Sequence, residues 1–351
     1  MRTRRVALGI VLAVGLVAAR VTLLPAAEGP YHQARLITIG GEGGWDYLSV
    51  DAAARRLYVS HATKVIVIDI DKDVVVGEIG PVGGVHGLAV APDLGRGFAS
   101  AGQENKVAIV DLKTLQIVSK VDTGQNPDSV LYEPGHQEVY AFNGRSNSAT
   151  VFDAKTGEVR ATIALPGKPE FAVVDVKAGR IYNNIEDQNV VVAIDTGAHA
   201  VAATWPITPG ESATGLAIDL ARHRLFAICG NKLMVMMDSV TGKVLGSVPI
   251  GAGVDAAAFD PGTGLVFASG GDGTLTVARV DEKGAFAVVQ TLATPPRSRT
   301  MTLDPKTHKL YASSAEFGAP VPGPDGRPGR APMVAGSFKV VVFEMKEAAG
   351  R

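Results

Sequence analysis

The sequence predicts an all-β protein, a seven-bladed β-propeller whose ring is closed by the N-terminal strand. Three observations lead to this fold class: a repeat of about 42 residues, four short strands in each repeat, and a last repeat that lacks its fourth strand. In each repeat a short apolar strand ends in an acidic or proline corner, and an apolar–aromatic pair opens a second strand. The seven stretches are YLSVDAAARRLYVS, GLAVAPDLGRGFAS, SVLYEPGHQEVYAF, FAVVDVKAGRIYNN, GLAIDLARHRLFAI, AAAFDPGTGLVFAS and TMTLDPKTHKLYAS.

A third apolar strand follows each stretch, and in the first six repeats a turn and a fourth strand complete the unit. The strands are short, rich in Val, Ile and Tyr, and separated by Gly and Asp turns, as in propeller blades. A single four-stranded unit cannot bury both of its faces, so the units are expected to stack around an axis. The predicted blades are 45–85, 86–126, 127–168, 169–211, 212–254, 255–297, and 298–345 completed by 34–41.

The last repeat stops after its third strand, at 337–345, while the segment ARLITIGG (34–41) precedes the first repeat and has no blade of its own. We expect 34–41 to supply the missing strand. This closure would leave no blade with an unpaired edge, and an exposed edge is a template for aggregation. The sequence therefore predicts one domain, from 34 to 345.

The N-terminus has the pattern of a secretory signal. MRTRR is a basic start and VALGIVLAVGLVAA (6–19) is an apolar run of signal-peptide length. We expect cleavage after Ala19 or near Ala27, with retention as an anchor as the alternative, so residues 1–27 are the predicted signal peptide. The predicted location is periplasmic or secreted, with no membrane span after signal removal. The only cysteine, Cys229, excludes an internal disulfide.

Charge narrows the choice of partners. The chain holds 34 basic and 35 acidic residues, a formal net charge of −1, with no basic stripe. Phosphate binding needs clustered Lys and Arg, so nucleic acid is not expected as a partner. The predicted partner is a small polar ligand or an envelope protein, and the predicted oligomeric state is a monomer.

The repeat unit LYVSHATKVIVIDIDKDVVVGEI (57–79) resembles the repeat core of the YncE-like proteins with YVTN repeats. The resemblance extends over residues 34 to 345. It implies an exported bacterial seven-bladed propeller, in a family where some members are similar to lactonases and others to protein-binding modules. The family often has Asp-Asn-Thr in the second turn, where this first blade has HATK instead.

One register position of the repeat is polar in every blade. It lies just before the innermost strand, where the chain passes from the outer strand of one blade to the inner strand of the next. We therefore expect a polar ring around one end of the central channel, near turns such as YNNIEDQN (182–189) and the Pro/Gly-rich segment 318–336. The predicted ring residues are Asp46, His86, Asp128, Glu170, Thr214, Asp255 and Arg299.

Two groups are expected within this ring. Arg299 of blade seven lies between Asp255 and Asp46 in ring order, and a guanidinium can pair with two flanking carboxylates. The other group is Asp128 and Glu170, which have no obvious cation and are expected to raise one another's pKa or bind a counter-ion.

A divalent metal is a candidate for that counter-ion. A mixed set of nitrogen and oxygen donors favours zinc or manganese over calcium. The alternative for His86 is a neutral imidazole hydrogen-bonded to a neighbouring blade, while Glu186, Asp187 and Gln188 are expected to be turn residues. The candidate metal ligands are His61, His86, Asp128, Glu170 and Asn184.

Three classes of function remain open, the third of which is a purely structural envelope protein. The first is a binding scaffold for a small polar ligand or a partner protein at this face. The second is a metal-assisted hydrolase or lactonase, with Asp128 or Glu170 as the candidate general base. Nothing in the strand pattern demands a nucleophile or an acid–base pair, and a propeller fold alone does not imply chemistry. The binding scaffold is therefore the favoured hypothesis.

Overall fold

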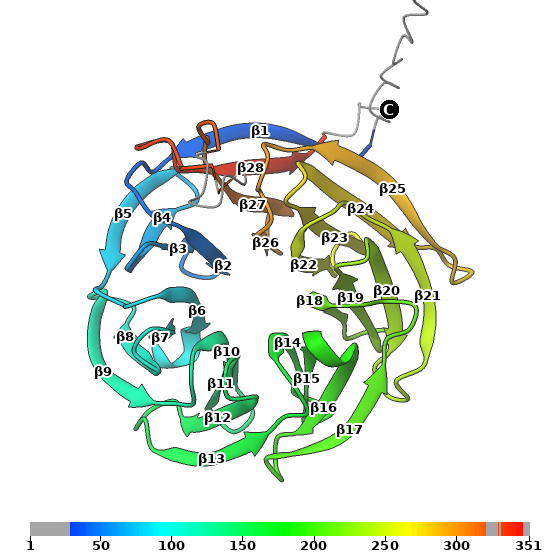
Figure 1. The fold of residues 1–351 in the computed structure, drawn as a ribbon, viewed down its shortest axis with the longest axis horizontal. Coiled ribbons are helices and arrows are strands. Elements are labelled where there is room, and N and C mark those ends of the chain that lie inside the picture. The colour runs from blue at the N-terminus through cyan, green and yellow to red at the C-terminus, as the bar shows by residue number, and fades with distance from the viewer. Residues whose placement is uncertain (1–28, 321–328, 330, 347–351) are drawn as a thin grey trace, which may run out of the picture.

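The computed structural model describes residues 29–320, 329 and 331–346. The predicted signal peptide, and residues 321–328 and 330 of the Pro/Gly-rich segment 318–336, lie outside the described residues. Figure 1 shows seven four-stranded sheets arranged around a central channel. Every pair of neighbouring strands within a sheet is antiparallel, as in a meander. The predicted seven-bladed propeller is confirmed.

The strands fall into four sets by their distance from the channel. The innermost strands are β2 (Trp45–Asp51), β6 (Val85–Ala91), β10 (Pro127–Glu133), β14 (Pro169–Asp175), β18 (Ala213–Asp219), β22 (Val254–Asp260) and β26 (Met301–Asp304). The second strands are β3 (Arg56–His61), β7 (Arg96–Ala101), β11 (Glu138–Asn143), β15 (Arg180–Ile185), β19 (Arg224–Cys229), β23 (Leu265–Gly270) and β27 (Lys309–Ser314).

The third strands are β4 (Lys64–Asp69), β8 (Lys106–Asp111), β12 (Ser148–Asp153), β16 (Val190–Asp195), β20 (Leu233–Asp238), β24 (Thr274–Val280) and β28 (Lys339–Met345). The outermost strands are β5 (Val74–Ile79), β9 (Gln116–Asp122), β13 (Val159–Ala164), β17 (Ala200–Pro206), β21 (Val244–Pro249), β25 (Phe286–Ala293) and β1 (Tyr31–Thr38). Two short 3₁₀ turns, η1 (Pro92–Leu94) and η2 (Glu186–Gln188), join neighbouring strands.

Closure of the ring by the N-terminal strand is confirmed. The sheet of blade seven has the order β1-β28-β27-β26, so a strand from the start of the chain pairs with one from its end. Pairing runs from Tyr31 opposite Met345 to Thr38 opposite Lys339, so β1 begins earlier than the predicted 34. The main-chain N–H of Tyr31 donates to the Oε1 of Gln290 (2.9 Å), whose Nε2 donates back to the Tyr31 carbonyl (2.8 Å). Blade six therefore helps to hold the closing strand.

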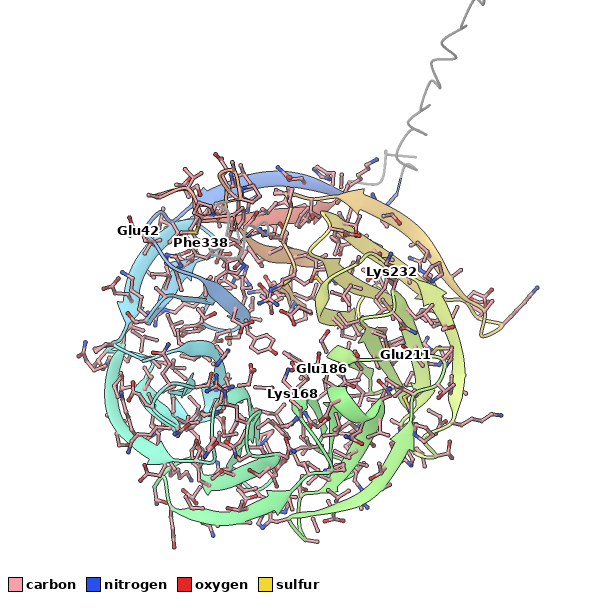
Figure 2. All side chains as sticks on the ribbon, viewed as in Figure 1. Glu42, Lys168, Glu186, Glu211, Lys232 and Phe338 are labelled. Carbon is pink, nitrogen blue, oxygen red and sulfur yellow. The ribbon has the colours of Figure 1, made fainter. Side chains whose placement is uncertain are left out.

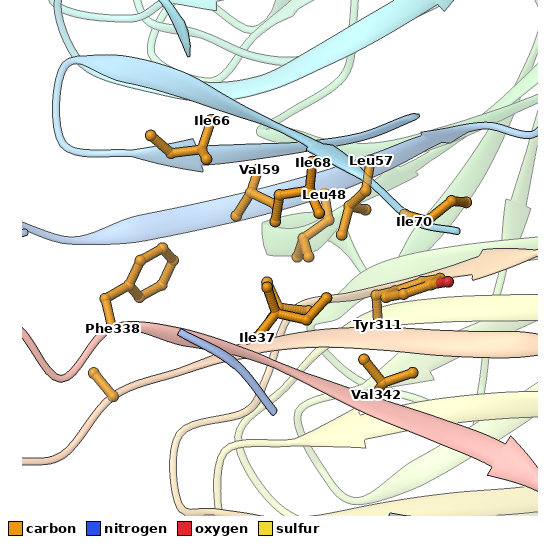
Figure 3. Close-up of a cluster of buried hydrophobic side chains, with 12 residues drawn as sticks. Ile37, Leu48, Leu57, Val59, Ile66, Ile68, Ile70, Tyr311, Phe338 and Val342 are labelled. Carbon is orange, nitrogen blue, oxygen red and sulfur yellow. The ribbon is translucent and has the colours of Figure 1, made fainter. Parts of the chain in front are cut away.

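The core lies between adjacent blades. The second and third strands are buried on both faces because a blade packs against each side, which explains their nearly continuous apolar residues. Outer strands such as β5 and β13 expose most of their residues. Figure 3 shows one such interface, where Ile37, Tyr311 and Phe338 of blade seven pack against side chains of blade one that include Leu57 and Ile68.

The aspartates that end the third strands are turn-forming residues. Asp69 Oδ1, for example, accepts the main-chain N–H groups of Asp71 (3.1 Å) and Lys72 (3.0 Å). The same geometry recurs at Asp111 and Asp153. A carboxylate that binds its own chain two and three residues on stabilises a tight turn. These repeated acids therefore define the hairpins.

None of the helices in the described ranges has the length and apolar character needed to span a membrane.

Candidate functional site at the channel mouth

A local irregularity in the innermost strands positions the polar ring. In blades one to six the pairing between the first and second strands shifts register at the start of the strand. In blade one the shift lies between Trp45 and Leu48, and in blade four between Pro169 and Ala172. The predicted ring residues Asp46 and Glu170 fall inside these shifts. An irregularity of this kind re-aims a side chain, here away from the core and towards the channel.

These side chains surround a cavity of about 210 Å³, which we call the mouth pocket. Six of the seven predicted ring residues line this pocket. The seventh, His86, contacts two of them. The lining residues are Asp46, Tyr47, Asp128, Lys168, Glu170, Glu186, Thr214, Asp255 and Arg299. Among them, five carboxylates face two basic side chains.

His86 bridges two of the carboxylates. Its Nδ1 lies 2.8 Å from Asp46 Oδ2 and 3.5 Å from Asp128 Oδ1. Burial disfavours the imidazolium, but the hydrogen bond to Asp46 and the charge of Asp128 outweigh it and raise the pKa of His86 to about 9. Burial raises the pKa of Asp128 to about 6, although His86 opposes this effect. The expectation that Asp128 has no nearby cation is therefore wrong.

Glu170 also has a basic neighbour, which the sequence analysis did not anticipate. Lys168 Nζ lies 2.6 Å from Glu170 Oε1 and 2.5 Å from Glu186 Oε2. Figure 2 shows Lys168 and Glu186 near the inner end of blade four. Burial and the charge of Asp128 raise the pKa of Glu170 to about 8 in spite of Lys168. The spacing Lys168-x-Glu170 could have indicated this pair, because alternate residues of an extended chain share a face.

Glu186 comes from the 3₁₀ turn η2, which folds back to the pocket. Glu186 is a turn residue, as expected, but its side chain also lines the pocket, which was not predicted. Asp187 accepts the main-chain N–H of Lys168 (2.8 Å) and so does shape the turn.

Arg299 makes one of its two expected ion pairs. Its Nη1 lies 2.9 Å from Asp255 Oδ2, whereas Asp46 hydrogen-bonds to His86 instead. The Asp255 side chain is only 9% exposed, while that of Arg299 is 48% exposed. Burial raises the pKa of Asp255 to about 7, and Arg299 counteracts part of this effect. The guanidinium thus stabilises one buried carboxylate and keeps part of its surface open to the mouth.

Two predicted metal ligands have structural contacts of their own. His61 is buried and stacks on Phe338, with ring centroids 4.1 Å apart and an interplanar angle of 11°. Asn184 is fully buried, and its Nδ2 donates to the carbonyls of Thr214 (2.9 Å) and Gly215 (3.0 Å). Asn184 therefore ties blade four to blade five.

Among the described His, Cys, Asp and Glu side chains, those whose donor atoms lie close enough to share one ion are Asp46, His86 and Asp128. This group contains two of the predicted candidates and one ring residue that was not among them. It does not include His61 or Glu170.

Two aromatic rings meet in the channel below the polar residues. Tyr47 of blade one lines the mouth pocket, and its ring contacts Phe171 of blade four. Burial, with the nearby carboxylates, holds the pKa of Tyr47 well above its usual range. On the far side Phe171 lines a second cavity of about 290 Å³, with mainly apolar neighbours such as Leu216 and Phe259. The two rings therefore separate a polar mouth from an apolar lower channel.

The sequence contains a pattern that could have predicted the pair Tyr47 and Phe171. The residues that follow the seven ring positions are Tyr47, Gly87, Ser129, Phe171, Gly215, Ala256 and Thr300. Only Tyr47 and Phe171 have large side chains. The small residues at the other five positions leave the space that the two rings occupy. A Cβ on Gly87 would lie 2.9 Å from Tyr47 Cβ, which is too close for an ordinary contact.

Fold and site together define a seven-bladed β-propeller with a charged channel mouth. Over 147 residues, the chain is 24% identical to the uncharacterized protein YncE of Escherichia coli K12 and to its counterpart in Salmonella typhi. That match covers 39% of this chain and 41% of each relative, so it spans about two fifths of the relatives' length. No family model matches the sequence.

A solved structure shares the fold. Hydrazine synthase from Kuenenia stuttgartiensis superposes with a TM-score of 0.67 at 15% identity, over 81% of this chain and 95% of that chain. At this identity the likeness concerns the fold alone. Together with the similarity to YncE it confirms the resemblance to YncE-like propellers, and it supports a general role as a propeller scaffold.

Proposed function

We propose that this protein is a binding scaffold whose mouth pocket holds a small polar ligand with a cationic group. The observation that carries the proposal is the charge of the lining: five carboxylates against the two basic side chains Lys168 and Arg299. Three of these carboxyls have raised pKa values, so negative groups outnumber positive ones, even with His86 protonated, once the pH is high enough to ionise most of them. A cleft lined by one sign of charge attracts ligands of the opposite sign. Lys168 and Arg299, both partly exposed, are available to a carboxylate or hydroxyl of the same ligand.

The size of the pocket favours a small molecule over a protein. About 210 Å³ lies below the range of roughly 300–1,000 Å³ that is usual for drug-sized ligands. A ligand of a few heavy atoms, such as a short amine or an amino acid, fits this space. The alternative occupant, an envelope protein inserting one side chain, would use the same charges.

The proposed location is periplasmic or secreted. It is supported by the basic and apolar pattern of the first 19 residues and by the bacterial origin of both YncE relatives.

A second candidate function is a metal-assisted hydrolase acting on a lactone or related ester. The specific observation in its favour is the group Asp46, His86 and Asp128, which could hold an ion beside the other carboxylates. Such an ion would polarise a carbonyl. Glu170, with a pKa near 8, and Asp128, with a pKa near 6, titrate in the range where general acids and bases work. Because Asp128 would then be a ligand of the ion, Glu170 is the candidate general base of this alternative, and Asp128 is the candidate only if it does not bind the ion.

A ligand screen tests the proposal. Saturation-transfer NMR would compare small amines, amino acids, neutral sugars and dicarboxylates on the parent and on Asp255→Asn and Glu186→Gln variants. We expect amines or amino acids to bind the parent and to lose at least tenfold in affinity on the variants. Glu211→Gln removes an exposed carboxylate from the connection between blades four and five, outside the pocket, and serves as the matched control. Binding only by dicarboxylates, or binding unchanged in both pocket variants, would overturn the proposal. Turnover of a lactone panel would favour the hydrolase.

A further inference from the structure

We propose that Asp46, His86 and Asp128 form a binding site for one divalent transition-metal ion at the channel mouth. This inference deepens the proposed function and rests on it only in sharing the same pocket. The three residues come from the innermost strands of blades one, two and three, β2, β6 and β10. The site would therefore join three consecutive blades.

The donor atoms already converge. One atom from each residue, His86 Nδ1 and one oxygen from each carboxylate, lies within 4.8 Å of the other two. From Nδ1, Asp46 Oδ2 is 2.8 Å away and Asp128 Oδ1 is 3.5 Å away. Metal–ligand bonds of about 2.0–2.2 Å in a tetrahedral site put neighbouring donors roughly 3.3–3.6 Å apart. The observed spacing needs only small side-chain rotations to reach that geometry.

One of these donors has no hydrogen-bond partner. Asp128 Oδ1 is buried and accepts no hydrogen bond, since its distance of 3.5 Å from His86 lies at the limit of such an interaction. A buried carboxylate oxygen without a partner costs free energy and calls for an explanation. A bound cation at the point shared with Asp46 and His86 supplies that missing partner.

The Nε2 side of the His86 imidazole also has a polar neighbour. The Asn126 side chain lies beside the His86 imidazole and contributes to its raised pKa. A Cβ on Gly102 would lie 2.8 Å from His86 Nε2 and 2.9 Å from Asn126 Oδ1, so both atoms lie against Gly102 and only glycine leaves them room. An Nε2–H directed at Asn126 Oδ1 leaves Nδ1 as the nitrogen that faces the two carboxylates, where a metal ion would replace the Nδ1 proton. An oxygen partner on the other ring nitrogen is the usual arrangement for a metal-binding histidine.

The backbone near two of the ligands is fixed by serines at equivalent positions. Ser60 Oγ accepts the main-chain N–H of Asp46 (2.9 Å), and Ser100 Oγ accepts that of His86 (3.3 Å). Both serines are buried in the second strands, β3 and β7. Adjacent blades therefore present their donors in the same way, which limits how much order a metal must impose on binding.

One imidazole and two carboxylates favour zinc or manganese. Calcium takes six to eight oxygen ligands, more than this group provides. Three protein ligands on a tetrahedral or five-coordinate ion leave one or two positions for water or for a polar ligand in the mouth.

Isothermal titration calorimetry tests the site. Zn²⁺, Mn²⁺ and Ca²⁺ would each be titrated into chelator-treated protein prepared without a polyhistidine tag. We expect one equivalent of Zn²⁺ or Mn²⁺ to bind, Ca²⁺ to bind at least tenfold more weakly, and affinity for the bound metal to fall at least tenfold in Asp128→Asn and His86→Gln. The control variant Glu211→Gln, which removes an exposed carboxylate at the rim, should bind each metal ion with the affinity of the parent. Circular dichroism melting of each variant separates loss of ligands from loss of folding.

A further variant, Asn126→Ala, tests the site even if the ligand variants fold poorly. Asn126→Ala keeps all three donors and should weaken Zn²⁺ binding by several-fold, because His86 loses its orienting partner. No heat with any of the three ions, or an affinity unchanged in Asp128→Asn, would overturn the metal site. Loss of metal binding alone, with amines still binding to the pocket, would leave the proposed function intact. Metal binding without amine binding would support the metal site and overturn the proposed binding of a cationic ligand.

Discussion

Tyr47 of blade one and Phe171 of blade four meet across the central channel, with ring centroids 5.5 Å apart and an interplanar angle of 62°. Edge-to-face contacts of this kind add about 0.5–1.5 kcal/mol to the burial of the rings. Blades one and four are not neighbours in the ring, so this contact braces the channel from within. It also gives the mouth pocket a floor.

Replacing Phe171 by Ala should therefore destabilise the protein and join the two cavities. Phe171 is half-buried, so we expect a loss of about 2 kcal/mol in the free energy of unfolding, below the roughly 3–5 kcal/mol of a fully buried Phe. Urea titration measures this loss. Tyr47→Phe keeps the ring and should unfold within about 0.5 kcal/mol of the parent. Equal stability of Phe171→Ala and the parent would show that the contact contributes nothing to the fold.

Arg299 should matter more at high pH than at low pH. Burial gives Asp255 a folded pKa of about 7, above its usual 3.8, so its ionisation costs stability as pH rises through this range. Arg299 reduces that cost. Because the guanidinium is half exposed, we expect Arg299→Ala to lose about 1–2 kcal/mol at pH 8 and much less at pH 5.

The double variant Arg299→Ala/Asp255→Asn is the matched control, since it has no carboxylate to ionise at that position. Its stability should vary less with pH than that of Arg299→Ala in paired urea titrations. If Arg299→Ala lost the same free energy at both pH values, the guanidinium would act by packing and not through its charge.

The ring could be predicted from sequence because its cause repeats. The same register shift recurs at the start of six innermost strands, so alignment of the repeats brings Asp46, Asp128 and Glu170 to one position. The closing strand was also predictable. The last repeat lacks a fourth strand and the N-terminal strand belongs to no repeat, so pairing the two completes the last blade.

The ion pairs within the ring could not be predicted in this way. They depend on neighbours outside the aligned position. Lys168 lies two residues before its ring residue, and Glu186 returns through a 3₁₀ turn that, among the described residues, only blade four has at that place. Side-chain rotation decides the rest. Asp46 hydrogen-bonds to His86 and makes no ion pair with Arg299, although ring order allows either.

Closure of the ring should depend on Gln290 in blade six. This buried side chain satisfies both main-chain polar groups of Tyr31 at the start of β1. Gln290→Ala leaves those groups without partners, and we expect a loss of about 1–3 kcal/mol. Differential scanning calorimetry and light scattering measure stability and aggregation. The neighbouring exposed Thr291→Ala should behave as the parent. A parent-like melting temperature for Gln290→Ala would mean that pairing with β28 suffices for closure.

Asn184 should act through the fold and not through an ion. Its Nδ2 bonds to two carbonyls of the neighbouring blade, Thr214 and Gly215. Asn184→Ala removes both bonds from a fully buried position and should cost about 2–3 kcal/mol in urea titration. Calorimetric Zn²⁺ affinity should stay within twofold of the parent. A tenfold fall in affinity in a folded Asn184→Ala protein would instead make Asn184 a ligand.

Glu170→Gln should change stability in a pH-dependent way. The folded protein binds the Glu170 proton more tightly than the unfolded chain, with a pKa of about 8 against the usual 4.5. Between these values the native state holds more protons than the unfolded state, so stability contributed by this carboxyl is lost as pH rises. Glutamine keeps the shape and cannot ionise. Relative to the parent, Glu170→Gln should therefore gain stability between pH 5 and pH 9, by roughly 2 kcal/mol after allowance for the lost Lys168 pair.

Urea titrations of both proteins at pH 5, 7 and 9 measure this gain. Glu211→Gln, at an exposed position on the same rim, is the matched control and should show no pH-dependent difference from the parent. If Glu170→Gln were instead less stable than the parent by the same amount at all three pH values, the carboxyl would be ionised throughout. Lys168 would then outweigh burial and Asp128, and Glu170 would act in the mouth as a fixed negative charge and not as an acid that can give up a proton near neutral pH.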